Sequence, residues 1–253
     1  MDVFPFELLY QEHRRISSEA QTRGISIRLL GALAFHLRCP QYTPLRTQLG
    51  RELSDLDYVA LSRQWNGVID LLTALGYEFD ERRAMLHGRD RVLFFHPTGL
   101  RVDVFFDQLD MCHRIDFRER LTVDEETISL ADLLLEKMQI VRITDKDIID
   151  TVALLLEHPV TSTDQGINAD YIARRLAGDW GFYHTLTTNL RRISEEFMDR
   201  YPQLDQRARQ RVREQIRQLL DRIEAEPKTL KWKARARVGP TVQWYKDVGE
   251  LVR

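Results

Sequence analysis

The distribution of apolar and polar positions divides the chain into a first half of mixed texture and a helical second half. Residues Glu7–Thr22 are rich in helix formers and end before Gly24, which predicts an opening helix. The apolar and β-branched run Ile25–Leu30 predicts a strand. Gly31 then predicts a tight turn, and Ala32–Arg38 a helix.

Strand character returns after a stretch, Pro40–Gly50, that we interpret as a loop. The elements predicted next are a strand at Leu56–Leu61, a helix at Gln64–Leu75, and strands at Arg91–His96 and Arg101–Phe106. The last two are separated by Pro97-Thr98-Gly99, which is typical of a hairpin turn.

From Leu130 onwards apolar residues recur with a helical period. Helices are predicted over residues 130–141 and 148–156, and then at Ala169–Leu176, His184–Phe197 and Asp205–Ile223. His158–Gly166 reads as a linker. The pattern therefore predicts an α+β protein in which a small mixed β-sheet flanked by helices, residues 1–160, precedes a mainly α-helical region, residues 161–253.

Composition narrows the class of protein. Of the 253 residues 43% are hydrophobic, enough for a real core, and the net charge of -2 gives no overall attraction to nucleic acid or membrane. Cys39 and Cys112 form no CxxC motif, which favours a reducing compartment. With no signal peptide and no apolar run of about 20 residues, we expect a cytoplasmic protein without a membrane partner.

The most informative segment for chemistry is Ser54-Asp55-Leu56-Asp57-Tyr58-Val59. In a strand, Asp55 and Asp57 point to the same side, while Leu56 points to the other. Two adjacent carboxylates repel each other unless a cation lies between them, and Mg²⁺ or Mn²⁺ prefers such oxygen ligands. Because 39 acidic residues give about six acidic-x-acidic matches by chance, the pair alone is weak evidence.

A third carboxylate, Asp103, lies between two valines of a predicted strand, where desolvation makes a partner necessary. A shared metal ion is one such partner. The alternatives are that Asp55 caps a loop end and that Asp57 pairs with an arginine. Asp103 would then pair with Arg101 or Arg91. The metal hypothesis requires the three aspartates to converge, and arginines that hold them would count against it.

These residues resemble a known signature. The run Leu29–His36, then Arg51–Asp57, then Asp103, is similar to the glycine turn, paired-aspartate strand and third aspartate of nucleotidyltransferases of the DNA polymerase beta superfamily. Leu130–Lys137 and Asp145–Asp150 resemble helical elements of the branch that contains abortive-infection toxins and related bacterial proteins. The resemblance covers residues 24–160.

The resemblance implies a nucleotidyltransferase-like fold and a metal-dependent enzyme. Such an enzyme moves a nucleoside monophosphate from a nucleoside triphosphate to a hydroxyl acceptor and releases pyrophosphate. Asp55, Asp57 and Asp103 would be catalytic and would bind Mg²⁺ or Mn²⁺. The residues implied to contact the nucleotide are Gly31, Ala32, Ser54, Lys137 and Lys146.

Several of these assignments have simpler alternatives. Ala32 stands where the family usually has serine or glycine, so a hydroxyl on the phosphate is missing. That departure leaves open a catalytically inactive binding or regulatory module, similar to an antitoxin. Lys137 could be an ordinary solvated lysine, and Asp145 or Asp147 could cap a helix.

The C-terminal stretch is basic and contains aromatic residues. Its members are Lys228, Lys231, Lys233, Arg235 and Arg237, with Trp232, Trp244 and Tyr245. If residues 231–237 form a strand, alternate positions present one cationic face suited to RNA. The segment is a candidate site for an acceptor, RNA or protein, and a solvated run of charges is the simpler alternative.

Overall fold

The computed structural model describes residues 3–80 and 90–248 and has two compact units. The first comprises Met1–Pro40, Gly50–Leu109 and Ile115–Ser129, and the second Gln41–Leu49, Asp110–Arg114 and Leu130–Arg253. The predicted α+β class is confirmed. The division between the units, however, follows residue 129 and not residue 160, because the two helices after the sheet pack with the C-terminal helices.

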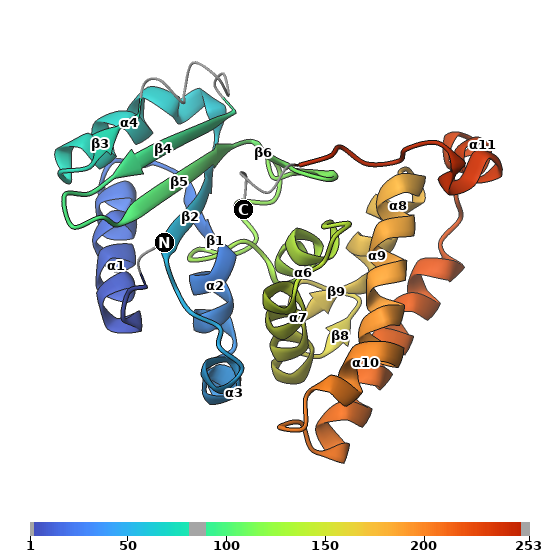
Figure 1. Ribbon diagram of the computed structural model, residues 1–253. Coiled ribbons are helices and arrows are strands. Elements are labelled where there is room, and N and C mark those ends of the chain that lie inside the picture. The colour runs from blue at the N-terminus through green and yellow to red at the C-terminus, as the bar shows by residue number, and fades with distance from the viewer. Residues whose placement is uncertain (1–2, 81–89, 249–253) are drawn as a thin grey trace. The chain divides into compact units, whose positions relative to one another are not determined.

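A five-stranded mixed sheet organises the first unit (Figure 1). Its strands are β1 (Ile27–Leu30), β2 (Asp55–Ala60), β3 (Glu78–Phe79), β4 (Arg91–Phe95) and β5 (Arg101–Phe106), in the order β1-β2-β5-β4-β3. β2 and β5 are parallel, and the other neighbours are antiparallel. The predicted hairpin between β4 and β5 is present, and Gly99 adopts a φ of 87° in its turn.

One face of this sheet packs on helices. The helices of the first unit are α1 (Phe6–Thr22), α2 (Gly31–Arg38) and α4 (Trp65–Ala74), with a 3-10 turn η2 (Ser62–Gln64). His13 of α1 bonds to the Tyr58 hydroxyl of β2 at 3.0 Å, and Trp65 of α4 packs on Phe106 of β5. These strand residues share one face, so α1 and α4 cover it and the predicted aspartates lie on the other.

The second unit is helical. Its elements are η1 (Pro40–Tyr42), α3 (Thr43–Gln48), α6 (Leu130–Met138), α7 (Asp145–Glu157), α8 (Ala169–Ala177), α9 (Trp180–Arg192), η3 (Ile193–Phe197), η4 (Met198–Arg200), α10 (Gln206–Ala225), α11 (Leu230–Val238) and η5 (Gly239–Thr241). β8 (Val160–Thr161) and β9 (Ile167–Asn168) form a short strand pair in this unit, and β6 (Gln108–Asp110) pairs with β7 (Arg114–Asp116) outside the five-stranded sheet. The predicted loop at Pro40–Gly50 is thus wrong in part, because it contains α3.

Helix α6 forms the centre of the second unit, since each of its residues is buried. The side chain of Asn189 on α9 donates to the carbonyls of Met138, at 3.2 Å, and Ile140, at 2.8 Å. These bonds satisfy carbonyls that the end of a helix otherwise leaves unpaired. Within residues 3–80 and 90–248, no helix has both the length and the apolar character needed to span a membrane.

Candidate active site

The sheet brings the three predicted aspartates to one face. In the parallel pair of β2 and β5, Asp57 lies opposite Asp103 and Asp55 lies opposite Arg101. Residues directly opposite each other on neighbouring strands point to the same side. The convergence expected from the sequence is therefore present at the level of the backbone.

Gly31 lies against this group of carboxylates. It opens α2 with a φ of 71°, a conformation that glycine adopts without strain. A Cβ atom at this position would overlap Oδ2 of Asp57 and lie 3.0 Å from its Cγ. Gly31 was expected to contact a nucleotide, and in the structure the group that it approaches closely is the Asp57 carboxylate. Ala32 follows it in the buried first turn of α2.

Asp103 is buried and is bound by an arginine of the neighbouring strand. Arg91 Nε donates to Oδ1 at 2.8 Å, and a terminal nitrogen of the same guanidinium donates to Oδ2. The Asp103 side chain is 1% exposed, so this bidentate pair replaces water completely. Burial lowers the pKa of Arg91, but the hydrogen bond to Asp103 and the negative charges of Asp103, Asp57 and Asp55 together outweigh it, so the pKa is raised. Arg91 also stacks 5.0 Å above the Phe105 ring.

Asp55 is held from two sides. Ser54 Oγ donates to its Oδ1 at 3.1 Å, and Arg101 pairs with its Oδ2. Ser54 was expected to contact a nucleotide, and here it orients a carboxylate. Arg101 binds through one terminal nitrogen, and its buried Nε has no hydrogen-bond partner among the described residues.

The donor set suits a divalent cation in kind but is occupied by arginines. Three carboxylates on one sheet face supply the oxygen ligands that Mg²⁺ and Mn²⁺ prefer. Asp55 and Asp103, however, each bind a guanidinium. Among the residues the structure describes, no group of three His, Cys, Asp or Glu side chains is arranged to hold a metal. The alternative in which Asp103 pairs with Arg91 is confirmed, and a cation would compete with the two arginines for the carboxylate oxygens.

Lys137 belongs to a buried ion network in the second unit. Its Nζ lies 3.0 Å from Glu136 Oε1 and 3.6 Å from Asp150 Oδ2, with its side chain 10% exposed. Arg46 of α3 donates to Asp150 Oδ1 from Nε at 3.1 Å and from a terminal nitrogen at 2.8 Å. Lys137 is therefore not the solvated lysine of the simpler alternative. Arg46 escaped the sequence analysis because nothing in a predicted loop marks an arginine as buried.

Lys146 is exposed in the first turn of α7. The helix begins with a capping box in which Thr144 and Asp147 satisfy each other's backbone amides. The capping role considered for Asp147 is thus confirmed in this reciprocal form, whereas Asp145 accepts a bond from the Tyr201 hydroxyl at 3.3 Å. The role of Lys146 in nucleotide binding stays a prediction.

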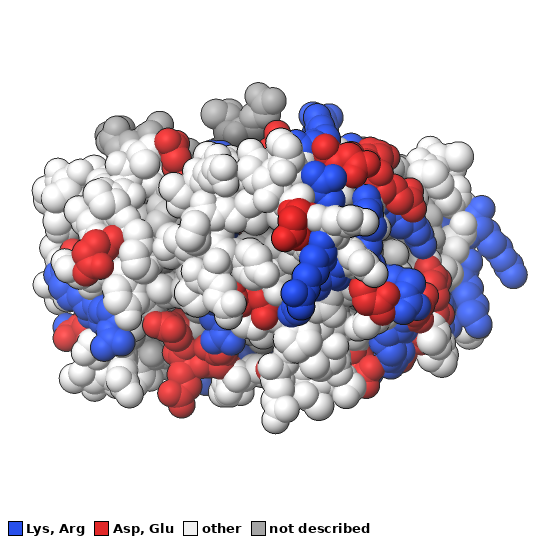
Figure 2. Space-filling view, turned by 90° about the horizontal axis from the view of Figure 1, so that it is seen from below, with Lys and Arg blue, Asp and Glu red and all other residues white. Residues whose placement is uncertain are grey.

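The basic C-terminal segment is a helix, so the predicted strand and its single cationic face are wrong. In α11, Lys231 and Arg235 share one side, and Lys233 and Arg237 the other. Arg235 donates to the carbonyls of Gly239 and Val242 at 2.6 and 2.7 Å. Figure 2 shows basic side chains interleaved with acidic ones at the surface of the second unit.

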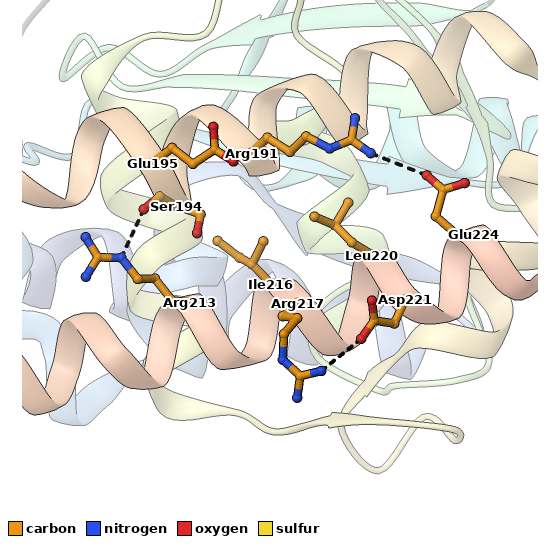
Figure 3. A pocket seen from close by; sticks show the side chains of 9 residues that line it. All are labelled: Arg191, Ser194, Glu195, Arg213, Ile216, Arg217, Leu220, Asp221 and Glu224. Atoms are coloured by element: carbon orange, nitrogen blue, oxygen red, sulfur yellow. Dashed lines mark hydrogen bonds and ion pairs between the residues drawn. The ribbon is translucent and has the colours of Figure 1, made fainter.

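A pocket of about 460 Å³ lies between α9, η3 and α10 (Figure 3). Ile216 and Leu220 form its apolar floor. Its arginines bind at its margin, where Arg191 pairs with Glu224, Arg217 with Asp221, and Arg213 with the Ser194 carbonyl. The pocket contains none of the residues that the sequence implies to bind a metal or a nucleotide, so it is a weaker candidate for a ligand site than the aspartate face of the sheet.

No protein-family model matches this chain, and a search of curated proteins finds no match to it. The case for a function consequently rests on the residues and the geometry of the sheet.

Proposed function

We propose that the chain is a metal-dependent nucleotidyltransferase that moves a nucleoside monophosphate from a nucleoside triphosphate to a hydroxyl acceptor and releases pyrophosphate. The observation that carries the proposal is the meeting of Gly31, Asp57 and Asp103. Gly31 opens a helix in direct contact with Asp57, and Asp57 is in register with Asp103 on a parallel strand. The sequence resemblance and this geometry point to the same three positions.

In the proposed reaction, Asp55 and Asp57 would hold Mg²⁺ or Mn²⁺. A bound divalent cation would supply charge stabilisation for the triphosphate and activation of the attacking oxygen. Asp103 adds negative charge beside Asp57. Asp103 would also accept the proton of the attacking hydroxyl, at an oxygen for which Arg91 competes, since both oxygens of Asp103 accept hydrogen bonds from that guanidinium.

The test uses each of the four triphosphates labelled at the α-phosphate, Mn²⁺ or Mg²⁺, and cell extract as the source of acceptor. We expect pyrophosphate and a labelled product, and we expect Asp57→Asn to abolish both. Asp70→Asn is the matched control, because Asp70 is an exposed aspartate of α4 in the same unit. Turnover that survives Asp57→Asn, or no turnover with any triphosphate, would contradict the proposal.

A second candidate is a binding or regulatory module that keeps the fold without the chemistry. The arginines on Asp55 and Asp103, together with the missing hydroxyl at Ala32, favour it. Calorimetric titration separates the two candidates. An enzyme binds triphosphate in a manner that depends on the divalent cation, and the inactive module does not.

We propose separately that the acceptor binds at α11. The side chains of Lys231, Lys233 and Arg237 of α11 are exposed and bind no other residue among those described. If RNA is the acceptor, its affinity will fall steeply with salt and will be lost on truncation after Glu226. An affinity for RNA that survives this truncation would show that RNA binds outside α11, and the absence of any affinity for RNA would favour a protein or a small molecule as the acceptor.

A further inference from the structure

Two arginines on the aspartate face are bound in different ways. Arg91 places two nitrogens on the two oxygens of Asp103. Arg101 places one nitrogen on Asp55 and leaves its buried Nε without a partner among the described residues. The side chain of Arg101 is also the more exposed, at 23% against 17% for Arg91. Arg101 is therefore the less firmly held of the two.

A guanidinium offers five N–H donors in a planar fork that matches the oxygens of a phosphate. A buried donor with no acceptor costs free energy in the folded state. An oxyanion bound beside Arg101 would satisfy its Nε, which the protein itself does not. Phosphate oxygens fit this requirement, because they accept charge-assisted hydrogen bonds from two arginine nitrogens at once.

Arg101 and a divalent cation would compete for the same oxygen of Asp55, because two positive groups at one oxygen repel each other. Ser54 donates to Oδ1 of Asp55, and Arg101 donates to Oδ2. A cation bound between Asp55 and Asp57 would take that oxygen and repel the guanidinium. The same event would free Arg101 for a new anionic partner.

We propose that Arg101 is a phosphate-binding residue that leaves Asp55 when a divalent cation binds, and then binds the triphosphate. This inference rests on the proposed function. Cation and triphosphate binding are consequently coupled. The cation alone binds weakly because it must displace Arg101, and the triphosphate strengthens cation binding by giving Arg101 another acceptor.

The test measures two affinities in Arg101→Gln. One is the affinity for Mn²⁺ in the absence of nucleotide, measured from the paramagnetic resonance signal of free Mn²⁺. The other is binding of inorganic triphosphate with Mg²⁺ present, followed by calorimetry. We expect Mn²⁺ to bind several-fold more tightly and triphosphate about tenfold more weakly, the latter being the loss of a charge-assisted hydrogen bond.

Two further variants serve as controls. Arg63→Gln removes a positive charge from an exposed arginine of the same unit that binds no other described residue, and it should change both affinities less than twofold. Arg101→Lys keeps the charge without the fork, and it should weaken triphosphate binding while leaving Mn²⁺ binding near that of the unmodified protein.

The direction of the two changes decides the outcome. A merely structural role for Arg101 predicts that both ligands weaken together, and that result would overturn the inference, as would no change in either. If Mn²⁺ binding tightens and triphosphate binding weakens but no triphosphate is ever turned over, the exchange stands and the transferase fails. If triphosphate is turned over but Arg101→Gln changes neither affinity, the transferase proposal stands and the proposed exchange of Arg101 fails.

Discussion

At the position of Gly31, the backbone and the neighbouring side chain impose two separate demands for glycine. Its φ of 71° strains any other residue, and the Asp57 carboxylate fills the space of a Cβ atom. We expect Gly31→Ala to lower the free energy of unfolding by more than the roughly 1–2 kcal/mol of a left-handed residue. Urea denaturation measures the change.

Gly76→Ala is the matched control for this substitution. Gly76 has a φ of 87°, but nothing lies within 4 Å of its missing Cβ. In Gly76→Ala, the free energy of unfolding should therefore fall only by the cost of the left-handed backbone conformation. Equal losses in the two variants would mean that Asp57 moves away without cost, which would contradict the close packing described above.

A second prediction for individual residues concerns the buried pair of Arg91 and Asp103. Arg91→Met leaves Asp103 buried with its charge uncompensated, and we expect it to lower the free energy of unfolding by on the order of 3 kcal/mol. The double variant Arg91→Met with Asp103→Leu should recover most of that loss. Additive losses would show that the pair is not coupled.

At the scale of elements, the sequence predicts β2, β4 and β5 well because each is an apolar run bounded by turn residues. The shared face of Asp55 and Asp57 follows from strand geometry alone. The arginine partners could only be offered as alternatives. Choosing Arg91 or Arg101 for Asp103 requires the register of strands, which depends on long-range packing.

For α11, by contrast, the sequence pattern predicted the wrong type of element. Alternate lysines and arginines suggested a strand, but Lys, Ala and Arg also favour a helix. Thr229 caps its start by accepting a bond from the Trp232 amide, and Gly239 ends it with a φ of 64°. Local end signals were therefore better evidence than the alternation of charge.

Gly181 in the first turn of α9 supports a prediction about the C-terminal segment. A Cβ there would lie 2.5 Å from the Trp244 carbonyl oxygen, and the Trp244 indole donates to Thr185 Oγ1 at 3.0 Å. We expect Gly181→Ala to release this segment with little loss of core stability. Faster proteolysis after residue 239, with tryptophan fluorescence shifted to the red, would report it.

Gly178→Ala provides the control for that experiment, since its Cβ would meet only the Arg175 carbonyl at 4.0 Å. It should leave the proteolytic pattern unchanged. If Gly181→Ala behaves in the same way, the contact with Trp244 does not hold the segment.

For the whole molecule, buried histidines set the response to acid. Burial lowers the pKa of His113 to about 4 and also lowers the pKa of His13, from 6.5 in the unfolded chain. Below pH 6.5 the unfolded chain binds protons that the folded protein excludes, so stability is full above pH 6.5 and falls as pH decreases toward 4.

We expect His113 to lower the free energy of unfolding by about 1 kcal/mol between about pH 7.5 and 5.5, and His13 to act in the same direction. Urea denaturation at the two pH values measures the difference. His113→Gln should remove the share of His113 from it, whatever its effect on stability at neutral pH. An unchanged difference would show that His113 titrates normally in the folded protein.

The bond between Arg46 and Asp150 has a consequence for synthesis of the chain, because the two residues are 104 positions apart. At the usual pace of translation, about 5–20 s pass between the appearance of the two residues. During that interval the nascent protein carries a charged segment whose final partner has not yet been made. Chaperone occupancy during elongation should therefore persist on α3 after the strands have emerged.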